Sequence, residues 1–327
     1  MFASTYPTSI RGVSILIVLA MASLSVSAQS AAPAPAAATV TIDLSPQFVQ
    51  GRTTHYEFWS LRQHSGVTRM PDLQPMTFTS AIEMTGQVTW TVQRVAADGS
   101  AMCIMTINWA TSKNTDNEGT TTAADSRQAK SDDEHAHNFL KAITNVPLTV
   151  QVAADGSITK VTGVDAIKRK GGEDLNELDE LDFIEVASDL ATLPGGPSEL
   201  PGAAAVGKTW RQDYTWNHDM GKVHQPMRYT VSSYETIAGI GLVTVDGKAK
   251  TRFEPKKQDD ELPVDVRMTR GQVTTQIMFD MYRHEAVGRN TLESRDFEVK
   301  VKMPDNAMIT STVSETVQGQ VLRIAEK

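Results

Sequence analysis

The feature that most restricts the fold of this chain is an alternation of apolar and polar residues, with a period of two, that begins near residue 40. Val88, Trp90 and Val92 share one face of the run 87–92, because successive side chains of a strand point to opposite faces. Comparable runs occur at 272–281, 297–301 and 309–317. Such runs predict a mainly β (α+β) protein of antiparallel meanders, each with one apolar and one polar face.

One hexapeptide, Val-Ala-Ala-Asp-Gly-Ser, occurs at 95–100 and again at 152–157. Each copy lies between two strand-like runs. Asp-Gly supplies the positive φ that a tight hairpin turn requires. The sequence therefore predicts two hairpins of the same construction.

A coarser similarity relates two larger blocks of the chain. The triplets at 51–53 and 207–209 are each followed by Tyr, Trp and a further strand. A duplicated β unit is one interpretation, and chance similarity between β-rich sequences is the other. The predicted fold is two tandem curved sheets or half-barrels with a few covering helices. The predicted organisation is a signal peptide (1–28), an Ala/Pro tether (29–41), a first β unit (42–170), an acidic helical segment with a Pro/Gly loop (171–206) and a second β unit (207–327).

The first 28 residues have the pattern of a secretory signal. Arg11 is the only charged residue there, the core 13–22 is apolar, and Val26, Ser27 and Ala28 are small residues suited to cleavage. An apolar run of about ten residues is too short to cross about 30 Å of hydrocarbon. We therefore expect an exported protein, periplasmic or extracellular, without a transmembrane anchor.

The single cysteine, Cys103, cannot form an internal disulfide. It lies in an alternating run, where a buried and inert thiol is expected. The core must then be large enough to fold without covalent links, and about 300 residues suffice for that.

Two segments have helical composition. The stretch 123–144 is rich in Ala and charged residues, offers Ala136, Phe139, Leu140 and Ile143 as an apolar face, and ends before Pro147. Its first half is polar all round, so it is either a helix end that frays or a disordered segment. The acidic segment 173–193 places apolar residues at every third position. A spacing of three drifts around a helix of 3.6 residues per turn, which favours two short helices or one with a spiralling apolar side.

Acidic residues are concentrated in one segment. The chain has a formal net charge of −8, and nine acids but no Lys or Arg lie between positions 171 and 207. The absence of a sustained basic excess argues against nucleic acid and anionic lipid surfaces as partners. The acids form either the solvent face of a helix or a docking surface for a cation or for a basic partner such as an envelope protein. The candidates for the docking surface are Glu177, Asp179, Glu180, Asp182 and Glu185.

The known catalytic and metal-binding patterns are not matched. His135 and His137 are two positions apart, so on a helix they point in opposite directions and cannot hold one ion. His284 has no second histidine four residues later. Ser157 and Lys160 match a Ser-x-x-Lys pattern but lie in a strand, where they face opposite ways. No catalytic residue, cofactor or metal ligand is predicted, which favours binding over catalysis and leaves the question of enzyme activity open.

Methionine is unusually frequent in the predicted strands. Flexible thioethers fill irregular gaps in a core, and they also line promiscuous apolar cavities. Both interpretations are open for this chain. The candidates for an apolar groove are Met102, Met105, Trp109, Met278 and Met281.

The signal, the tether, the two Gly triplets and the repeated hairpins together resemble uncharacterised exported bacterial β-rich families of unknown function. More loosely, the pattern is similar to the half-barrel lipid carriers of the bacterial envelope, in which a curved antiparallel sheet wraps helices and shields an acyl chain. That resemblance implies an apolar small molecule or lipid as ligand. The lipidated cysteine of many such carriers is absent, and no site residue is implied.

Three functional hypotheses follow. The first is a non-enzymatic exported protein that binds an apolar ligand or an envelope partner through curved β-sheets. The second is an interaction scaffold that docks through the acidic segment 173–193. The third is an envelope hydrolase with an unusual site, which would require His55, His218 or His224 to meet carboxylates in one pocket.

Overall fold

The computed structural model describes residues 42–172, 203–218, 221–237, 239–255, 264–303 and 307–324. The segments 1–28 and 29–41 and most of the acidic segment 171–206 lie outside these residues.

The predicted alternation forms strands throughout the described part of the chain. The strands are β1 (Ile42–Asp43), β2 (Thr53–Arg69), β3 (Met76–Val95), β4 (Ala101–Thr115), β5 (Thr121–Asp125), β6 (Leu148–Val152), β7 (Ile158–Thr162), β8 (Ala203–Ala204), β9 (Thr209–His218), β10 (Gly221–Ile237), β11 (Ile240–Lys250), β12 (Arg252–Pro255), β13 (Val264–Asp280), β14 (Glu285–Lys302) and β15 (Met308–Arg323). The helices are α1 (Glu134–Ile143) and α2 (Val164–Gly171).

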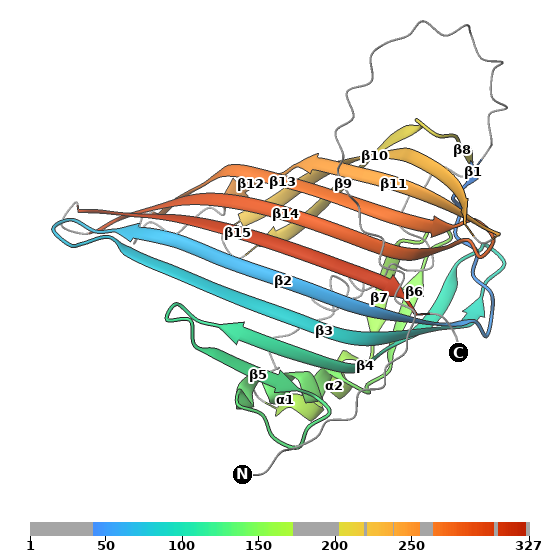
Figure 1. Cartoon of the computed structure of the whole chain (residues 1–327), viewed down its shortest axis with the longest axis horizontal. Helices are drawn as coiled ribbons and strands as arrows, with labels where there is room; N and C mark the ends of the chain where they lie inside the picture. Colours follow the sequence, from blue (N-terminus) through green and yellow to red (C-terminus); the bar gives the residue numbers. More distant parts are fainter. Residues whose placement is uncertain are drawn as a thin grey trace, which may run out of the picture. The chain divides into compact units, whose positions relative to one another are not determined.

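Most of these strands belong to a single sheet. Within the described residues, 13 strands follow the order β12-β10-β11-β13-β14-β15-β2-β3-β4-β6-β7, with β5 added to β4 and β9 to β10. Neighbouring strands are antiparallel, and the long ones lie side by side in Figure 1. The mainly β, antiparallel prediction is therefore confirmed. Strands of both predicted β units join this sheet, because β15 pairs with β2 over a long register that sets Val321 opposite Phe58.

Both predicted hairpins form. One joins β3 to β4 and the other joins β6 to β7, and β4 pairs with β6, so the hairpins are neighbours. Gly99 and Gly156 have φ of 84° and 90°, as a left-handed turn position requires. In each turn the first Ala N–H donates to the Ser carbonyl at 2.8 Å. Identical local sequence thus produces identical backbone hydrogen bonding.

The two Gly triplets also make matching backbone contacts. The Gly51 N–H donates to the Val92 carbonyl at 2.8 Å, and the Gly207 N–H donates to the Val231 carbonyl at 2.8 Å. Each triplet thereby begins a strand beside the next long strand of the chain. A duplicated β unit stays a prediction.

The two faces of the sheet differ in composition. We call inner the face that carries Phe58 and Val321, and outer the face that carries Trp59. The inner face holds both apolar core clusters. Cluster 1 includes Tyr56, Trp90 and Met105 from β2, β3 and β4, and cluster 2 includes Val245 and Phe279 from β11 and β13.

Two short helices cover cluster 1. Leu140 of α1 and Ile167 of α2 are fully buried in it. Asp133 caps α1 by accepting the Ala136 N–H at 2.8 Å, and it also accepts the Asn114 amide at 2.9 Å. No helix in the described part of the chain has the length and apolarity needed to cross a bilayer.

The helix predicted over 123–144 is wrong in its first half. Residues Thr121–Asp125 form β5, which pairs with the end of β4. The open edge of β4 supplies backbone hydrogen bonds to this segment, and such tertiary partners override a weak helical propensity. Helix α2 was not predicted.

Cys103 is fully buried in cluster 1. Burial raises the pKa of its thiol to about 12. The thiol is therefore neutral and behaves as a small apolar side chain, as predicted.

Candidate ligand-binding site

The inner face changes character along the strands. Near α1 and α2 it is apolar and covered. Next come two rows of charged residues, which we call the charged zone (Arg62, His64, Glu293, Arg295 and Glu315). Beyond them the face is mostly apolar again, in what we call the distal zone (Met76, Phe78, Val266, Met268, Phe297, Val299 and Val313).

Arg295 is the centre of the charged zone. Its Nε donates to Glu293 Oε1 at 2.7 Å and its Nη1 donates to Glu315 Oε2 at 3.3 Å. Arg62 Nε and His64 Nε2 lie 3.5 and 3.7 Å from Glu315 Oε1. Arg295 and Glu315 are buried, and burial of charges is tolerated only when partners satisfy them. The charged zone thus divides one apolar face into two.

The distal zone begins with a row of residues that the strand register sets side by side. Phe78, Val313 and Phe297 occupy this row together with Gly66 and Met268. The Phe78 ring lies over Gly66, where a Cβ would overlap it. Aromatic rings crossing a strand glycine in this way fix the register of a sheet.

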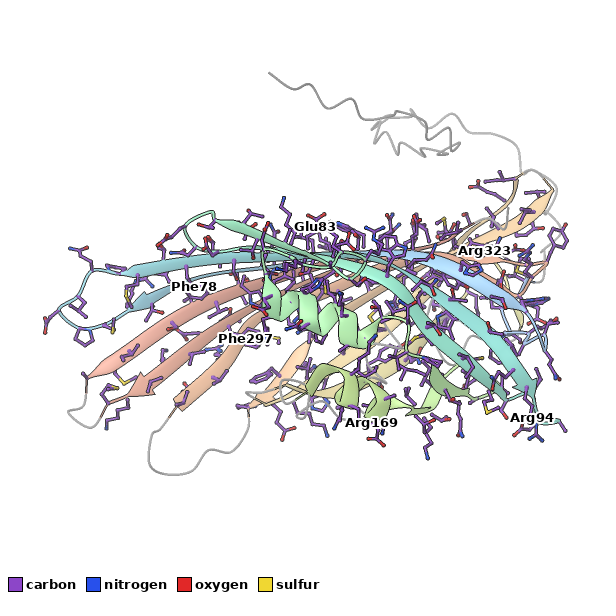
Figure 2. All side chains as sticks on the ribbon, turned by 90° about the horizontal axis from the view of Figure 1, so that it is seen from below. Phe78, Glu83, Arg94, Arg169, Phe297 and Arg323 are labelled. Atoms are coloured by element: carbon purple, nitrogen blue, oxygen red, sulfur yellow. The ribbon has the colours of Figure 1, made fainter. Side chains whose placement is uncertain are left out.

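The distal zone is only partly covered. Phe297 is buried edge-on against Phe253 of β12, with ring centroids 5.5 Å apart. In contrast, Met76 is 53% exposed, and Phe78 and Val313 are half-buried. Figure 2 shows Phe78 and Phe297 on strand ends that extend past the two helices. Within the described residues, this part of the inner face is apolar without a helix over it.

A second charged cluster lies at the opposite end of the strands. Arg323 of β15 contacts both Glu285 and Asp280, which are each 2% exposed. Arg52 Nη1 and Arg283 Nη1 approach Glu285 at 3.8 and 3.7 Å. The acids therefore face cations on several sides. This arrangement ties the residue before β2 to β13, β14 and β15.

The same cluster perturbs a neighbouring tyrosine. Tyr56 is buried, and its hydroxyl donates to the Ala286 carbonyl at 3.3 Å. Burial, followed by the nearby Glu285 charge, raises the pKa of Tyr56 far above its ordinary value. Tyr56 stays protonated and links the two core clusters.

The structure distributes the five predicted groove residues over three places. Met105 is in cluster 1 and Met281 packs against cluster 2. Met102 and Met278 are half-buried on the outer face. Trp109 is also on the outer face, where the Arg127 guanidinium lies 4.3 Å from its ring centroid. These residues are not brought together into one groove.

The predicted acidic docking surface (Glu177, Asp179, Glu180, Asp182 and Glu185) lies outside the described residues. The same holds for the rest of 173–193.

The histidines are likewise dispersed. On the outer face, His55 Nδ1 lies 2.9 Å from the Thr89 hydroxyl oxygen. His224 Nε2 lies 3.5 Å from Glu254 Oε2, near the edge of the sheet formed by β12. His218 has no described side chain. His137 is buried whereas His135 is exposed, so the two side chains lie in different surroundings. Among the described residues no group of three or more His, Cys, Asp or Glu side chains is placed to hold a metal ion.

Motif reasoning missed the charged zone. Its signal was nonetheless in the sequence: Arg62 and His64 occupy the same strand parity as Phe58, and Arg295 shares the parity of Phe297. Charged residues at strand positions whose neighbours on the same face are apolar indicate that the core is interrupted there. Their convergence from three strands could not be known before the pairing of β15 with β2.

The structure defines an open antiparallel sheet with a partly helix-covered inner face. The sequence matches, over residues 99–190, a family described as "Family of unknown function (DUF6263)", so the predicted resemblance to an uncharacterised family is confirmed. Among curated proteins none matches.

The chain also has weak similarity to solved structures, of which two are described here. The chain is similar to one in "Lipid-protein interactions in lipovitellin", with a TM-score of 0.45 and 9% identity over 85% of this chain and 26% of that chain. It therefore spans about a quarter of the lipovitellin chain. The outer membrane protein OprG from Pseudomonas aeruginosa gives a TM-score of 0.23 and 5% identity over 85% of this chain and 99% of that chain.

Proposed function

We propose that this is an exported, non-enzymatic protein that holds an apolar ligand against the distal zone of its inner face. The observation that carries the proposal is the partial exposure of apolar residues that lie on the same face as the buried core. Export is supported by the signal-like sequence 1–28.

The distal zone has the chemistry of an apolar binding surface. Burial of apolar surface contributes about 25 cal/mol per Å², so Met76, which is 53% exposed, leaves stabilisation unused. A ligand chain lying on Phe78 and Val313 would recover it. Side chains that soluble proteins normally cover are here available to a ligand.

The adjacent charged zone restricts what the ligand can be. Arg62 is 56% exposed in its side chain and lies 3.5 Å from Glu315. A polar head group can bond to Arg62 and His64 while its chain covers the distal zone. We therefore expect an amphiphile with an acidic head, such as a fatty acid, rather than a pure hydrocarbon.

The test is a titration with cis-parinaric acid, a fluorescent fatty acid. The purified protein should enhance its fluorescence saturably, and Phe78→Ser and Val313→Ser should each weaken binding at least tenfold. The matched control is Val67→Ser, which alters the outer face of β2 beside Gly66. A wild-type protein that does not bind the probe, or an equal loss in Val67→Ser, would contradict the proposal.

A further inference from the structure

A polar groove crosses the outer face of the sheet. It consists of two hollows of about 610 and 330 Å³ that share Asn290, Thr291 and Leu292. The side chains that line it come from six strands, β10, β11, β13, β14, β15 and β2. It lies on the face opposite the distal zone, so it is independent of the proposed function.

The strand register arranges the groove as two adjacent rows. One row contains Arg228, Lys248, Thr274, Leu292 and Gln318, and the other contains Thr230, Asp246, Gln276, Asn290, Gln320 and Trp59. Both rows run perpendicular to the strands. Six strands at about 4.8 Å spacing give a groove about 24 Å long.

One end of the groove is positively charged. Arg211, Arg228 and Lys248 lie directly opposite one another on β9, β10 and β11. Arg211 is paired with Asp213 at 2.9 Å. Neither Arg228 nor Lys248 makes an ion pair with any residue that the structure describes. Like charges directly opposite each other destabilise a sheet, and an anionic ligand would remove that repulsion.

The middle of the groove offers amide and hydroxyl groups. Gln276 donates to Asp246 at 3.0 Å, and Gln320 donates to Asn290 at 3.0 Å. These cross-strand pairs hold the side chains across the groove. Such groups can both donate to and accept from the hydroxyls of a sugar.

The other end of the groove carries an aromatic side chain. Trp59 is half-buried, and its indole N–H donates to Glu83 Oε1 at 2.8 Å. This bond fixes the ring beside Gln320 of the next strand. A fixed indole presents an apolar flat surface together with nearby polar groups, which matches the alternating C–H and O–H faces of a pyranose ring.

We propose that this outer-face groove binds an extended acidic polysaccharide. An acid group of the chain is held by Arg228 and Lys248, the next sugars are bonded by the amides, and one ring lies against Trp59. The straight course across six strands fits an extended β1,4-linked chain. Single-stranded nucleic acid fits less well, because it binds through several stacked aromatic side chains, whereas Trp59 is the one aromatic among the described residues that line the groove.

The test is a calorimetric titration of the purified protein with β1,4-linked hexamannuronate. We expect saturable binding that weakens as salt increases, and binding of neutral cellohexaose at least tenfold weaker. The double variant Arg228→Ala with Lys248→Ala should weaken hexamannuronate binding at least tenfold, as should Trp59→Ala. Gln318→Ala serves as a second groove variant, expected to weaken binding severalfold, if Trp59→Ala fails to fold.

Two matched controls should bind as the wild type does. Lys222→Ala removes another outer-face cation of β10, and Trp109→Ala removes another outer-face tryptophan. The proposal is overturned if hexamannuronate does not bind, if the double variant binds it unchanged, or if a thymidine decamer binds as tightly. The variants Phe78→Ser and Val313→Ser on the inner face leave this binding intact, so the two proposals can fail separately.

Discussion

The covered and distal parts of the inner face are made by the same strands and the same alternation, yet they reach different burial. In the covered part, Trp90 and Met105 are almost completely enclosed because α1 and α2 lie over them. In the distal part, residues of the same parity such as Met76 remain partly exposed. The alternation of apolar residues along a strand therefore specifies which face is inner. Whether that face is buried depends on whether a helix or another segment covers it.

The charged zone keeps the two parts separate. Arg295 and Glu315 pair within the sheet, so a ligand on the distal zone need not disturb the covered core. A protein with this division can have a rigid end and a binding end in one sheet.

The largest effect is expected at the ion cluster that joins the two core clusters. Arg323→Ala leaves Glu285 and Asp280 buried with fewer cations, and breaking a buried pair in this way costs about 3–5 kcal/mol. Urea unfolding measures the change in the free energy of unfolding. Arg283→Ala, at a residue whose side chain is 48% exposed, is the control and should cost less than about 1 kcal/mol. Equal costs for the two variants would show that Arg323 has no special role.

The next effect tests the helix cover itself. Leu140→Ala removes a fully buried side chain where α1 meets cluster 1, and such a cavity costs about 2–5 kcal/mol. Urea unfolding again measures the change in the free energy of unfolding. A cost below about 1 kcal/mol would mean that α1 does not close the core.

A smaller effect is expected at the helix cap. Asp133→Ala removes the acceptor for the Ala136 N–H and should cost about 1 kcal/mol. The backbone bond from Ala136 is the main cause that lowers the pKa of Asp133. Because the folded pKa lies below the unfolded value of about 3.9, this contribution is complete above that pH and is lost as the pH falls through the folded pKa. The difference between wild type and variant should shrink in acid, and a difference that grows in acid would contradict the assignment.

The smallest effect is expected in the distal zone. Met76→Ala should cost less than about 1 kcal/mol, because the side chain is already 53% exposed. Thermal unfolding of this variant beside Leu140→Ala compares the two parts of the inner face directly. If Met76→Ala costs as much as Leu140→Ala, the distal zone is core and the proposed ligand surface does not exist.

The hairpin turns and the methionine candidates show what could and could not be predicted from the sequence. The Asp-Gly turns at 98–99 and 155–156 predicted both hairpins, because turn geometry is encoded within four residues. The methionine candidates were less informative, since side-chain type does not reveal which face or which cluster receives a residue. Met105 and Met102 are three positions apart and lie on opposite faces.

The basic row of the outer groove could not be predicted from the sequence. Arg211, Arg228 and Lys248 are separated by about twenty residues each and form no charged run. Only the register of β9, β10 and β11 sets them opposite one another. The sequence-based argument against nucleic acid and anionic lipid surfaces rested on runs of charge along the chain, and such an argument does not detect rows of charge across strands.

By itself the sequence determined the β class, the two hairpin turns, the apolar parity of each strand and the inert thiol, because these depend on backbone geometry over a few neighbouring residues. The tertiary structure decided that β15 joins β2 in a single sheet, that 121–125 is a strand, and that charges meet on both faces. Those outcomes depend on pairing between residues far apart in the chain, and local patterns contain no information about which distant strand supplies the partner.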